Sequence, residues 1–434
     1  MYVSTKKRKF FVEINDKNCY YKNQKKDVLI LSFKGREYVQ IEISKKAETS
    51  LNEGHPWIYD GELRNIKGKP NNGELVDIVS YKGRYLGTGF YNDHSKIKIR
   101  VISKNANDKF DKAFFERRIK YAWDYRKTVM GDDLNCCRVI FGEADTFPGL
   151  TVDKFNDILV TQTLSLGIEK RKDIIFPLLM KVLNDDGQNI KAVYERNDVG
   201  IRKLEGLEEN KGFYIGTSEN TNTVITENGI KYNVDYENGQ KTGFFLDQKY
   251  NRLAVSKIAK GRKVLDCFTH TGSFALNAVK GGADSVCAVD ISEDAVEMAR
   301  KNAVLNGFEN KMTFRAANVF DLLPNIPASE KYDFIILDPP AFTKSRSTVD
   351  SAIRGYKEIN LRAMKLLPRG GYLATCSCSH FMKDELFREM LRSAAFDAGV
   401  SLRQIEARQQ SPDHPILWNV PETDYLKFYI FQIV

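Results

Sequence analysis

The chain has 434 residues, of which 42% are apolar and 28% are charged. These values are ordinary for a globular protein, and they exclude a disordered chain, a collagen-like repeat and a disulfide-rich miniprotein. No apolar run reaches the ~18 residues of a transmembrane helix, and the N-terminus lacks the apolar stretch of a secretory signal. We therefore expect a cytoplasmic protein that does not bind a membrane.

Cysteine and histidine usage argues against a metal site. The seven cysteines are odd in number, no two have the C-x-x-C spacing of a zinc or redox site, and the five histidines are scattered. Without a secretory signal, the thiols are expected to be reduced. We expect no metal.

The net charge of +9 is concentrated in the first quarter of the chain. Residues 1–104 contain 21 Lys and Arg against 12 Asp and Glu, whereas residues 105–434 contain 45 of each kind. A small basic module attached to a neutral body favours a polyanionic partner, above all a nucleic acid. The alternative is a surface that merely carries surplus lysine.

The N-terminal part of the chain predicts a small domain of strands. Residues 37–104 contain short alternating stretches bounded by Gly, Asn and Asp, which indicate a small antiparallel barrel. Within it, residues 51–63 predict a short helix followed by an exposed loop. The lysine-rich extension over 1–36 has no assigned role.

Residues 105–222 predict a central α/β domain without evident catalytic machinery. Its helices are indicated by apolar residues at helical spacing. The predicted elements are a helix over 110–130, a hairpin closed near Phe155, Asn156 and Asp157, a helix over 168–184 and a strand over 192–198.

From residue 223 to 434, strands alternate with helices of 10–15 residues, which predicts βαβ units and a parallel sheet. The last two strands have no helix between them and predict an antiparallel hairpin at the sheet edge. The predicted helices cover residues 272–281, 293–306 and 352–367.

Three polar residues follow consecutive strands of this sheet and indicate a cofactor site. Ligands of open α/β sheets bind at the carboxyl ends of the strands. Asp266 ends the first strand and suits a positively charged group, Asp290 suits the hydroxyls of a ribose, and Asn318 suits an adenine amine. Gly272 allows the ligand close to the backbone, although the chain lacks the G-x-G-x-x-G pyrophosphate motif. The alternative is that these side chains are helix caps.

The fourth strand ends in Asp338-Pro339-Pro340-Ala341-Phe342. Two prolines force a rigid, extended backbone. This backbone could hold the Asp338 carboxylate and the Pro339 carbonyl against a planar base. A structural turn is the alternative.

The fifth strand carries two cysteines, Cys376 and Cys378. Because side chains alternate along a strand, both face the same side, with Cys378 ~6.6 Å further toward the carboxyl end. We expect Cys378 to lie level with Asp338 and to act as a nucleophile. Cys376 is expected to pack as a small apolar residue, the alternative role for either thiol.

Several of these segments resemble one family, the class I S-adenosylmethionine-dependent methyltransferases that make 5-methylcytosine in 23S ribosomal RNA, known as the large-subunit methyltransferase I family. The resemblance covers about residues 37–434. It is carried by GHPWIYDGE, FGEADTFPGLTVDKF, QKTGFFLDQKYNR, VLDCFTHTGSFALNA, DPPAFTKSR…GYKEIN and TCSCSH.

The resemblance implies a PUA domain over 37–104, a central α/β domain with a β-hairpin over 105–222 and a Rossmann-like catalytic domain over 223–434. It implies S-adenosylmethionine as cofactor and RNA, most simply 23S rRNA, as partner; monomer and homodimer stay open. The family's S-C-S pattern falls on Cys378, but Cys376 fits the T-C-S pattern of related enzymes, so the choice between them stays open. Those enzymes also carry a Cys after the Pro-Pro, where this chain has Ala341-Phe342.

The expected mechanism is addition of a thiolate to C6 of cytosine, methylation at C5, loss of the C5 proton and release of the thiolate. A thiolate needs a nearby positive charge, which Lys344 or Arg346 could supply besides the cofactor itself. The expected catalytic residues are Cys378 and Asp338. The expected cofactor-binding residues are Asp266, Phe268, Gly272, Asp290, Asn318 and Asp338, together with Phe245 and Gln248, which lie in the Thr242–Gln248 loop. The expected substrate-binding residues are Pro339, Pro340, Phe342, Lys344 and Arg346.

Two other functions compete with this interpretation. D-P-P followed by an aromatic residue is also typical of enzymes that methylate the exocyclic amine of a base, where Phe342 would stack on the base and no cysteine is needed. The non-enzymatic alternative is an RNA-binding or assembly protein that keeps a cofactor fold without turnover. The base should be flipped out or lie in single-stranded RNA in either catalytic case.

Overall fold

The computed structural model describes residues 37–327, 329–343 and 345–434. Its N-terminal sheet lies within residues 39–103. The extension over 1–36 and Lys344 lie outside the described residues. The six strands have the order β2-β6-β5-β4-β1-β3. Their bounds are β1 Val39–Ile43, β2 Trp57–Tyr59, β3 Leu63–Lys67, β4 Leu75–Val79, β5 Tyr85–Tyr91 and β6 Ile97–Ser103.

Two expectations for this sheet are wrong. The segment predicted as an exposed loop contains β2, which pairs with β6, because Ile58 is fully buried in the small apolar core. The sheet is also not wholly antiparallel, since β1 pairs with β4 in parallel register. The helix α1 (Lys45–Asn52) follows β1 and begins at Ser44, whose hydroxyl accepts a hydrogen bond from the Ala47 amide.

The central sheet has the order β11-β10-β9-β8-β7. The predicted hairpin is present, because Asn156 adopts a left-handed φ of 56° and joins two strands whose ends, Phe155 and Ile158, pair directly. The helix expected over 168–184 is divided into two. The bounds are α2 Lys112–Met130, β7 Cys136–Phe141, β8 Leu150–Phe155, β9 Ile158–Thr163, α3 Leu166–Glu169, α4 Lys172–Asp185, β10 Ala192–Arg196 and β11 Lys211–Ile215.

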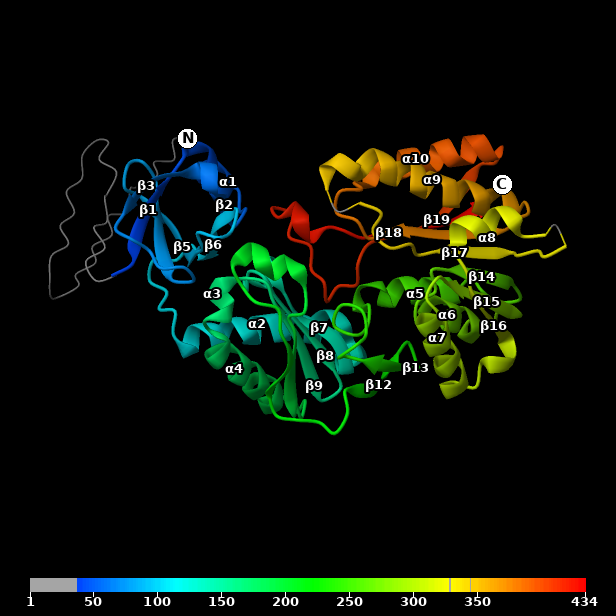
Figure 1. The fold of residues 1–434 in the computed structure, drawn as a ribbon, viewed down its shortest axis with the longest axis horizontal. Coiled ribbons are helices and arrows are strands. Elements are labelled where there is room, and N and C mark those ends of the chain that lie inside the picture. The colour runs from blue at the N-terminus through cyan, green and yellow to red at the C-terminus, as the bar shows by residue number, and fades with distance from the viewer. Residues whose placement is uncertain (1–36, 328, 344) are drawn as a thin grey trace, which may run out of the picture. The chain divides into compact units, whose positions relative to one another are not determined.

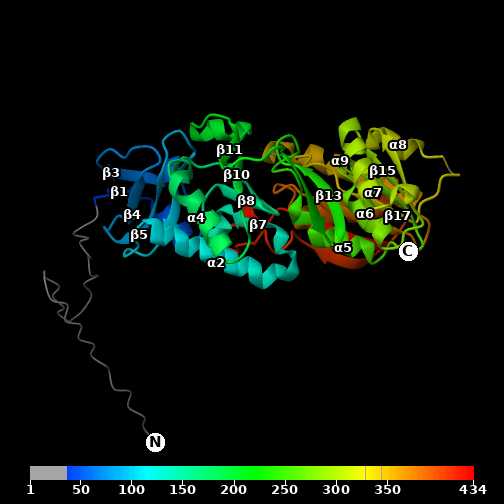
Figure 2. The ribbon, with the colours of Figure 1, turned by 90° about the horizontal axis from the view of Figure 1, so that it is seen from below.

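A separate hairpin, β12 (Asn222–Glu227) and β13 (Ile230–Asp235), lies alongside α6 (Ser273–Lys280) and α7 (Glu293–Leu305), as Figure 2 shows. Two asparagine side chains near the C-terminal end of α7 form hydrogen bonds with backbone amides of β13. Asn306 and Asn302 accept hydrogen bonds from the amides of Lys231 and Asn233 at 2.8 and 2.9 Å. The hairpin is thereby fixed to the C-terminal sheet.

The C-terminal sheet has the order β16-β15-β14-β17-β18-β20-β19, in which β20 is antiparallel to both neighbours. The prediction of a parallel sheet with an antiparallel hairpin at its edge is confirmed. The strands are β14 Lys263–Cys267, β15 Ser285–Asp290, β16 Met312–Ala316, β17 Phe334–Leu337, β18 Tyr372–Ser377, β19 Leu402–Arg408 and β20 Lys427–Ile433.

Helices cover both faces of this sheet (Figure 1). One face packs on α5 (Lys249–Ser256), α6 and α7, and the other packs on α8 (Val319–Asn325), α9 (Val349–Leu366) and α10 (Asp384–Ala398). The sequence analysis did not predict α8 or α10. No helix among the described residues is both long and apolar enough to span a membrane.

Candidate active site

The carboxyl ends of β14, β17 and β18 meet at one edge of the C-terminal sheet, where Asp266 is fully buried. Its Oδ2 accepts hydrogen bonds from the Thr269 hydroxyl at 2.6 Å and the Ala275 amide at 3.0 Å. Its buried Oδ1 accepts none from any described residue. Burial, together with the nearby Asp338 carboxylate, raises the pKa of Asp266 to about 7. Such an orphaned carboxylate fits a bound cation.

The loop after β14 has an unusual backbone. Phe268, His270 and Gly272 all have left-handed φ values, of 63°, 50° and 81°. A Cβ at Gly272 would lie 3.0 Å from Cβ of Ala299 on α7, so only glycine fits without displacement. Left-handed non-glycine residues concentrate at ligand sites. This loop aims its backbone at the same edge as Asp266.

The next two strands end in the side chains that the sequence analysis singled out. Asp290 accepts hydrogen bonds from the amides of His270 at 2.9 Å and Ser292 at 3.0 Å. Asn318 is the N-cap of α8 and accepts from the Phe320 amide at 3.0 Å. The side-chain oxygen of Asn318 is therefore a helix cap, as the alternative interpretation proposed. Asp290 instead connects the loop after β14 to the loop after β15.

The loop from Thr242 to Gln248 lies against this edge. Gln248 donates hydrogen bonds from Nε2 to Asp338 Oδ1 at 3.2 Å and to Cys376 Sγ at 3.5 Å. Its own Oε1 accepts from Asn251 at 2.6 Å. The ring of Phe245 meets the ring of His270 edge-on at 5.2 Å. The loop thus contacts both the β14 loop and the carboxylate of Asp338.

The expectation that Cys378 lies level with Asp338 is wrong. Leu337 pairs with Thr375, so Asp338 lies level with Cys376, whose thiol donates a hydrogen bond to Asp338 Oδ1 at 2.9 Å. Counting along β18 alone could not show this, because relative register depends on the loops before each strand. Cys378 follows the end of β18, with its Sγ 3.9 Å from the Pro339 carbonyl oxygen.

The two thiols differ in exposure. Of the six cysteines in the described range, five are buried, Cys376 among them, and Cys378 is partly exposed. Cys376 packs in the apolar cluster on the α5 and α6 face of the sheet, as predicted for a small apolar side chain. Cys378 is therefore the thiol that an entering molecule can reach.

The sequence analysis missed the positive charge that most strongly lowers the pKa of the Cys378 thiol. Burial raises the pKa of Cys378 to about 11, and the ammonium of Lys241 opposes this rise. Lys241 has a left-handed φ of 53°, and its Nζ lies 3.5 Å from Asp247 Oδ2 and 4.4 Å from the centre of the Phe245 ring. Nothing in the sequence marks it, since lysine rarely adopts this backbone. Arg346, expected in this role, is exposed at the start of a short helical turn and influences Tyr59 instead.

The two prolines that follow Asp338 differ in their exposure to solvent. Pro339 is buried and Pro340 is exposed. Phe342 is half-buried, and its ring packs on Tyr356 at 4.6 Å and Phe320 at 5.8 Å. Burial raises the pKa of Asp338 to about 6, against the hydrogen bond from the Cys376 thiol, which lowers it.

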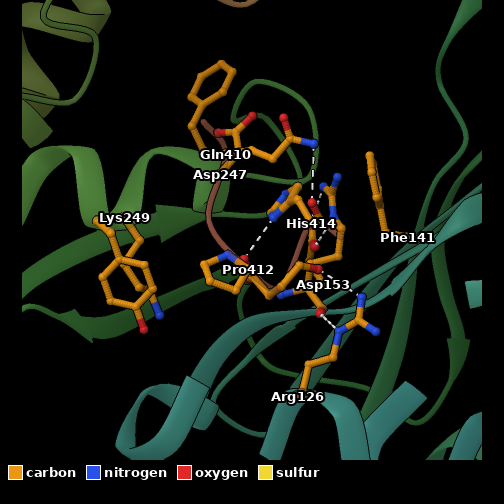
Figure 3. Close-up of polar contacts among 12 residues, drawn as sticks. Arg126, Phe141, Asp153, Asp247, Lys249, Gln410, Pro412 and His414 are labelled. Carbon is orange, nitrogen blue, oxygen red and sulfur yellow. Dashed lines mark hydrogen bonds and ion pairs between the residues drawn. The ribbon is translucent and has the colours of Figure 1, made fainter. Parts of the chain in front are cut away.

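A buried polar cluster fixes the Thr242–Gln248 loop to the central sheet (Figure 3). Asp153 on β8 pairs with Arg138 at 2.7 Å and accepts a hydrogen bond from the Thr242 hydroxyl at 2.6 Å. Tyr425 donates from its hydroxyl to Asp247 at 2.7 Å. Asp153, Thr242 and Asp247 lie within segments that carry the family resemblance, but sequence reasoning did not assign them this anchoring role.

The fold and this edge define the class of S-adenosylmethionine-dependent methyltransferases. The family model for an S-adenosylmethionine-dependent methyltransferase matches residues 211–431, and the model for a PUA-like domain matches residues 41–104. The chain uses S-adenosylmethionine, and the orphaned oxygen of Asp266 fits the cofactor's positive charge.

Similar proteins narrow the class. A ribosomal RNA large subunit methyltransferase I from Klebsiella pneumoniae is 40% identical over 92% of this chain and 99% of its own length. One of the same name from Aeromonas salmonicida is 42% identical over 90% of this chain and 98% of its own length. The chain belongs to the family of these methyltransferases.

Solved structures confirm the fold class. A SAM-dependent methyltransferase from Streptococcus mutans has a TM-score of 0.76 at 21% identity, covering 91% of this chain and 99% of its own. A methyltransferase complexed with SAH has a TM-score of 0.77 at 21% identity and the same coverage.

Proposed function

We propose that the protein transfers a methyl group to C5 of a cytosine in large-subunit ribosomal RNA through a covalent adduct with Cys378. The relatives' names supply the substrate class. The observation that carries the chemistry is the partly exposed thiol of Cys378 beside the carbonyl of Pro339, the residue that follows Asp338. C5 methylation requires a nucleophile and a group that binds the base, and the side chains of Cys378 and Asp338 are the candidates for those roles.

The proposed steps balance as follows. The Cys378 thiolate forms a bond to C6 of the ring, and the ring's electrons become available at C5. Bound S-adenosylmethionine would supply the methyl group as an electrophile, with its methyl–sulfur bond breaking so that the sulfonium leaves as a neutral thioether. A base then removes the C5 proton, and the C6–S bond breaks to release the thiolate and restore the ring. The carboxylate of Asp338 accepts a hydrogen bond from the exocyclic amine of the base, the proton donor on that edge of neutral cytosine.

For the cofactor we propose contacts from Asp266, Asp290, Asn318 and the backbone of the Phe268–Gly272 loop. Phe245 and Gln248 complete this side of the site, although Gln248 also donates to Asp338. Pro339, Pro340 and Phe342 are proposed to frame the base, with Arg346 near the opening. We retain the proposed domain division at residues 37–104, 105–222 and 223–434.

One observation favours a second function, methylation of an exocyclic amine of a base. Burial raises the pKa of Cys378 to about 11, so the thiol is largely protonated at neutral pH in the free protein. Methylation of an amine needs only Asp338, the Pro339 carbonyl and an aromatic ring such as Phe342. The base that carries the methyl group in the product separates the two functions.

The test is nucleoside analysis of a large-subunit rRNA transcript incubated with the protein and isotopically labelled S-adenosylmethionine. We expect labelled 5-methylcytidine from the wild type and from Cys376→Ala, and none from Cys378→Ala, with cofactor binding intact in all three. RNA containing 5-fluorocytidine should become covalently attached, because fluorine does not leave as a proton does.

Three results would redirect the proposal. A labelled N-methylated base, with Cys378→Ala still active, establishes the amine chemistry instead. Attachment that is lost only in Cys376→Ala moves the nucleophile to the other thiol. Binding of RNA without any methyl incorporation leaves an RNA-binding or assembly role.

A further inference from the structure

The loop that connects β19 to β20, residues 409–426, carries an almost fully exposed tryptophan. Trp418 is 97% exposed, and the neighbouring Leu417 is 37% exposed. The other two tryptophans are engaged inside the protein: Trp123 is 1% exposed, and Trp57 donates a hydrogen bond from Nε1 to Glu143 at 2.8 Å. An indole that leaves both faces open has its apolar surface available for a ligand.

Hydrogen bonds within the loop hold Trp418 in this position. The hydroxyl of Thr423 accepts from the Leu417 amide at 2.9 Å and donates to the Val420 carbonyl at 2.7 Å. The Val420 amide donates to the Leu417 carbonyl at 2.9 Å, which closes the turn around Trp418. The exposed ring is therefore presented by an ordered turn, which lowers the entropy cost of binding.

The same loop contacts residues near both the central and the N-terminal sheets. Asp413 accepts from the Arg138 amide at 2.8 Å, and its carbonyl accepts from Arg126 at 2.9 Å, which ties the loop to the central sheet (Figure 3). Glu422 lies 3.3 Å from His55 in the N-terminal domain. Asn419, next to Trp418, fills the space that a Cβ at Gly54 would need, at 2.4 Å.

A groove of about 1010 Å³ opens beside Trp418. His380, two residues after Cys378, lines this groove, and Lys427, which also lines it, donates from Nζ to the Ser379 carbonyl at 2.7 Å. The cationic side chains of its lining are Lys383, Arg388, Arg408 and Lys427, and the acidic ones are Asp384, Glu385 and Asp424.

Two of the three acids in the groove are already engaged. Asp384 accepts a hydrogen bond from the Tyr429 hydroxyl and lies 3.8 Å from Arg388, and Asp424 accepts from Gln409 at 3.4 Å. Lys383 and Arg388 are exposed, Lys383 at the N-cap of α10 and Arg388 in its second turn. The groove thus combines an open aromatic ring with cations that can follow a phosphate backbone.

We propose that Trp418 and this groove bind the single-stranded RNA that flanks the target nucleotide, with one base stacked on the indole and adjacent phosphates near Lys383 and Arg388. Aromatic platforms beside a positive groove are the common means of holding single-stranded nucleic acid. A peptide partner would need a wider apolar patch than one ring and Leu417. The proposal rests on the proposed function for its choice of RNA.

The test uses the fluorescence of Trp418 in the full-length protein. Titration with an oligocytidylate should quench the wild-type emission, because stacking brings a base onto the indole, and Trp418→Phe should lose this response. Because alanine removes the stacking contact between the base and the indole, Trp418→Ala should raise the KM for an rRNA transcript about tenfold. Trp418→Phe should keep most of the affinity, and kcat and cofactor affinity should not change.

Phe396→Ala is the matched control, since Phe396 is also exposed, at 84%, but does not line the groove. Unquenched emission, or a KM for Trp418→Ala equal to the wild-type value, overturns the proposal and leaves this surface to a protein partner. Quenching without formation of 5-methylcytidine keeps the RNA surface and rejects the proposed chemistry instead.

Discussion

The thiol of Cys376 donates a hydrogen bond to Oδ1 of Asp338 across 2.9 Å, while the Sγ of Cys378 lies 3.9 Å from the carbonyl oxygen of Pro339. Asp338 also accepts from Gln248, so two donors converge on one carboxylate oxygen. The two cysteines therefore differ in what they can do. Cys376 orients a carboxylate, and Cys378 has a thiol free to react.

The first prediction concerns the pH profile of Cys376→Ala. Burial raises the pKa of Asp338 to about 6, even though the hydrogen bond from the Cys376 thiol lowers it. Without the donor this pKa should rise, so methyl transfer should weaken near neutral pH and recover at higher pH. The free energy of unfolding should fall by about 1 kcal/mol, because one buried hydrogen bond is lost.

Rates of methyl transfer measured against pH check this prediction, with Cys378→Ala as the comparison. Cys378→Ala should be inactive at every pH. A Cys376→Ala profile that overlays the wild-type profile would mean that the thiol does not influence Asp338.

The second prediction is that cofactor affinity depends on the protonation of Asp266. Burial raises its pKa to about 7, so the carboxyl is neutral below that pH and charged above it. A bound cation favours the charged form, and affinity should therefore rise toward pH 7 and level off above it. Below the pKa of Asp266, cofactor affinity can change by at most about tenfold per pH unit, because a single proton is linked to binding.

Calorimetric titration with S-adenosylmethionine between acidic and mildly alkaline pH gives the measurement. Asp266→Asn keeps an acceptor for Thr269 and Ala275 but should bind weakly and without this pH dependence. Asp290→Asn should bind weakly with the pH dependence intact. An equal slope in Asp266→Asn would assign the titration to another group.

The third prediction is that Lys241 sustains the reactivity of Cys378. Its ammonium lowers a thiol pKa that burial raises to about 11, so Lys241→Met should move that pKa higher, and Lys241→Arg should not. The other groups that face this thiol are Asp247 on the same loop, Asp338 after β17, Cys376 on β18, Lys427 on β20 and Tyr356 on α9.

Alkylation of Cys378 by iodoacetamide, followed by peptide mass spectrometry across pH, reports the thiolate directly and needs no RNA. Lys257→Met, on a lysine just after α5, serves as the control for loss of one positive charge. Identical alkylation profiles for Lys241→Met and the wild type would contradict the assignment.

Much of this site could be predicted from local patterns. Strand ends such as those before Asp266, Asp290 and Asp338 are encoded by short apolar runs followed by a polar residue, and the alternation that puts Cys376 and Ala374 on one face is also local. The parallel sheet follows from the regular spacing of strands and helices.

Long-range relations could not be predicted. The register of β18 against β17 decided that Asp338 meets Cys376, and one residue alone does not encode register. Lys241 reaches the site through a left-handed backbone that no sequence signal announces. The sequence analysis did not single out Trp418, whose loop is held by contacts of Asp413 with Arg138 and of Glu422 with His55.

The last prediction concerns the basic N-terminal segment. Of the charge in the first 104 residues, residues 1–36 contain 10 Lys and Arg against 3 Asp and Glu, and residues 37–104 contain 11 against 9. Most of the surplus therefore precedes the PUA-like domain. Removal of residues 1–104 would also break the contacts of His55 with Glu422 and of Arg100 with Glu143 and Glu205. Deletion of residues 1–36 alone is the cleaner experiment.

This deletion should weaken RNA binding and make its dependence on salt less steep, because fewer counterions are released when fewer lysines contact phosphates. Cofactor affinity and thermal stability should match those of the full chain. Gel-shift titrations at several salt concentrations provide the slope. As a matched variant, replacement of Lys67 and Lys69 by Gln in the PUA-like domain should change the slope less than the deletion. Equal slopes for the deletion and the full chain would show that the charge of this segment does not contribute to RNA binding.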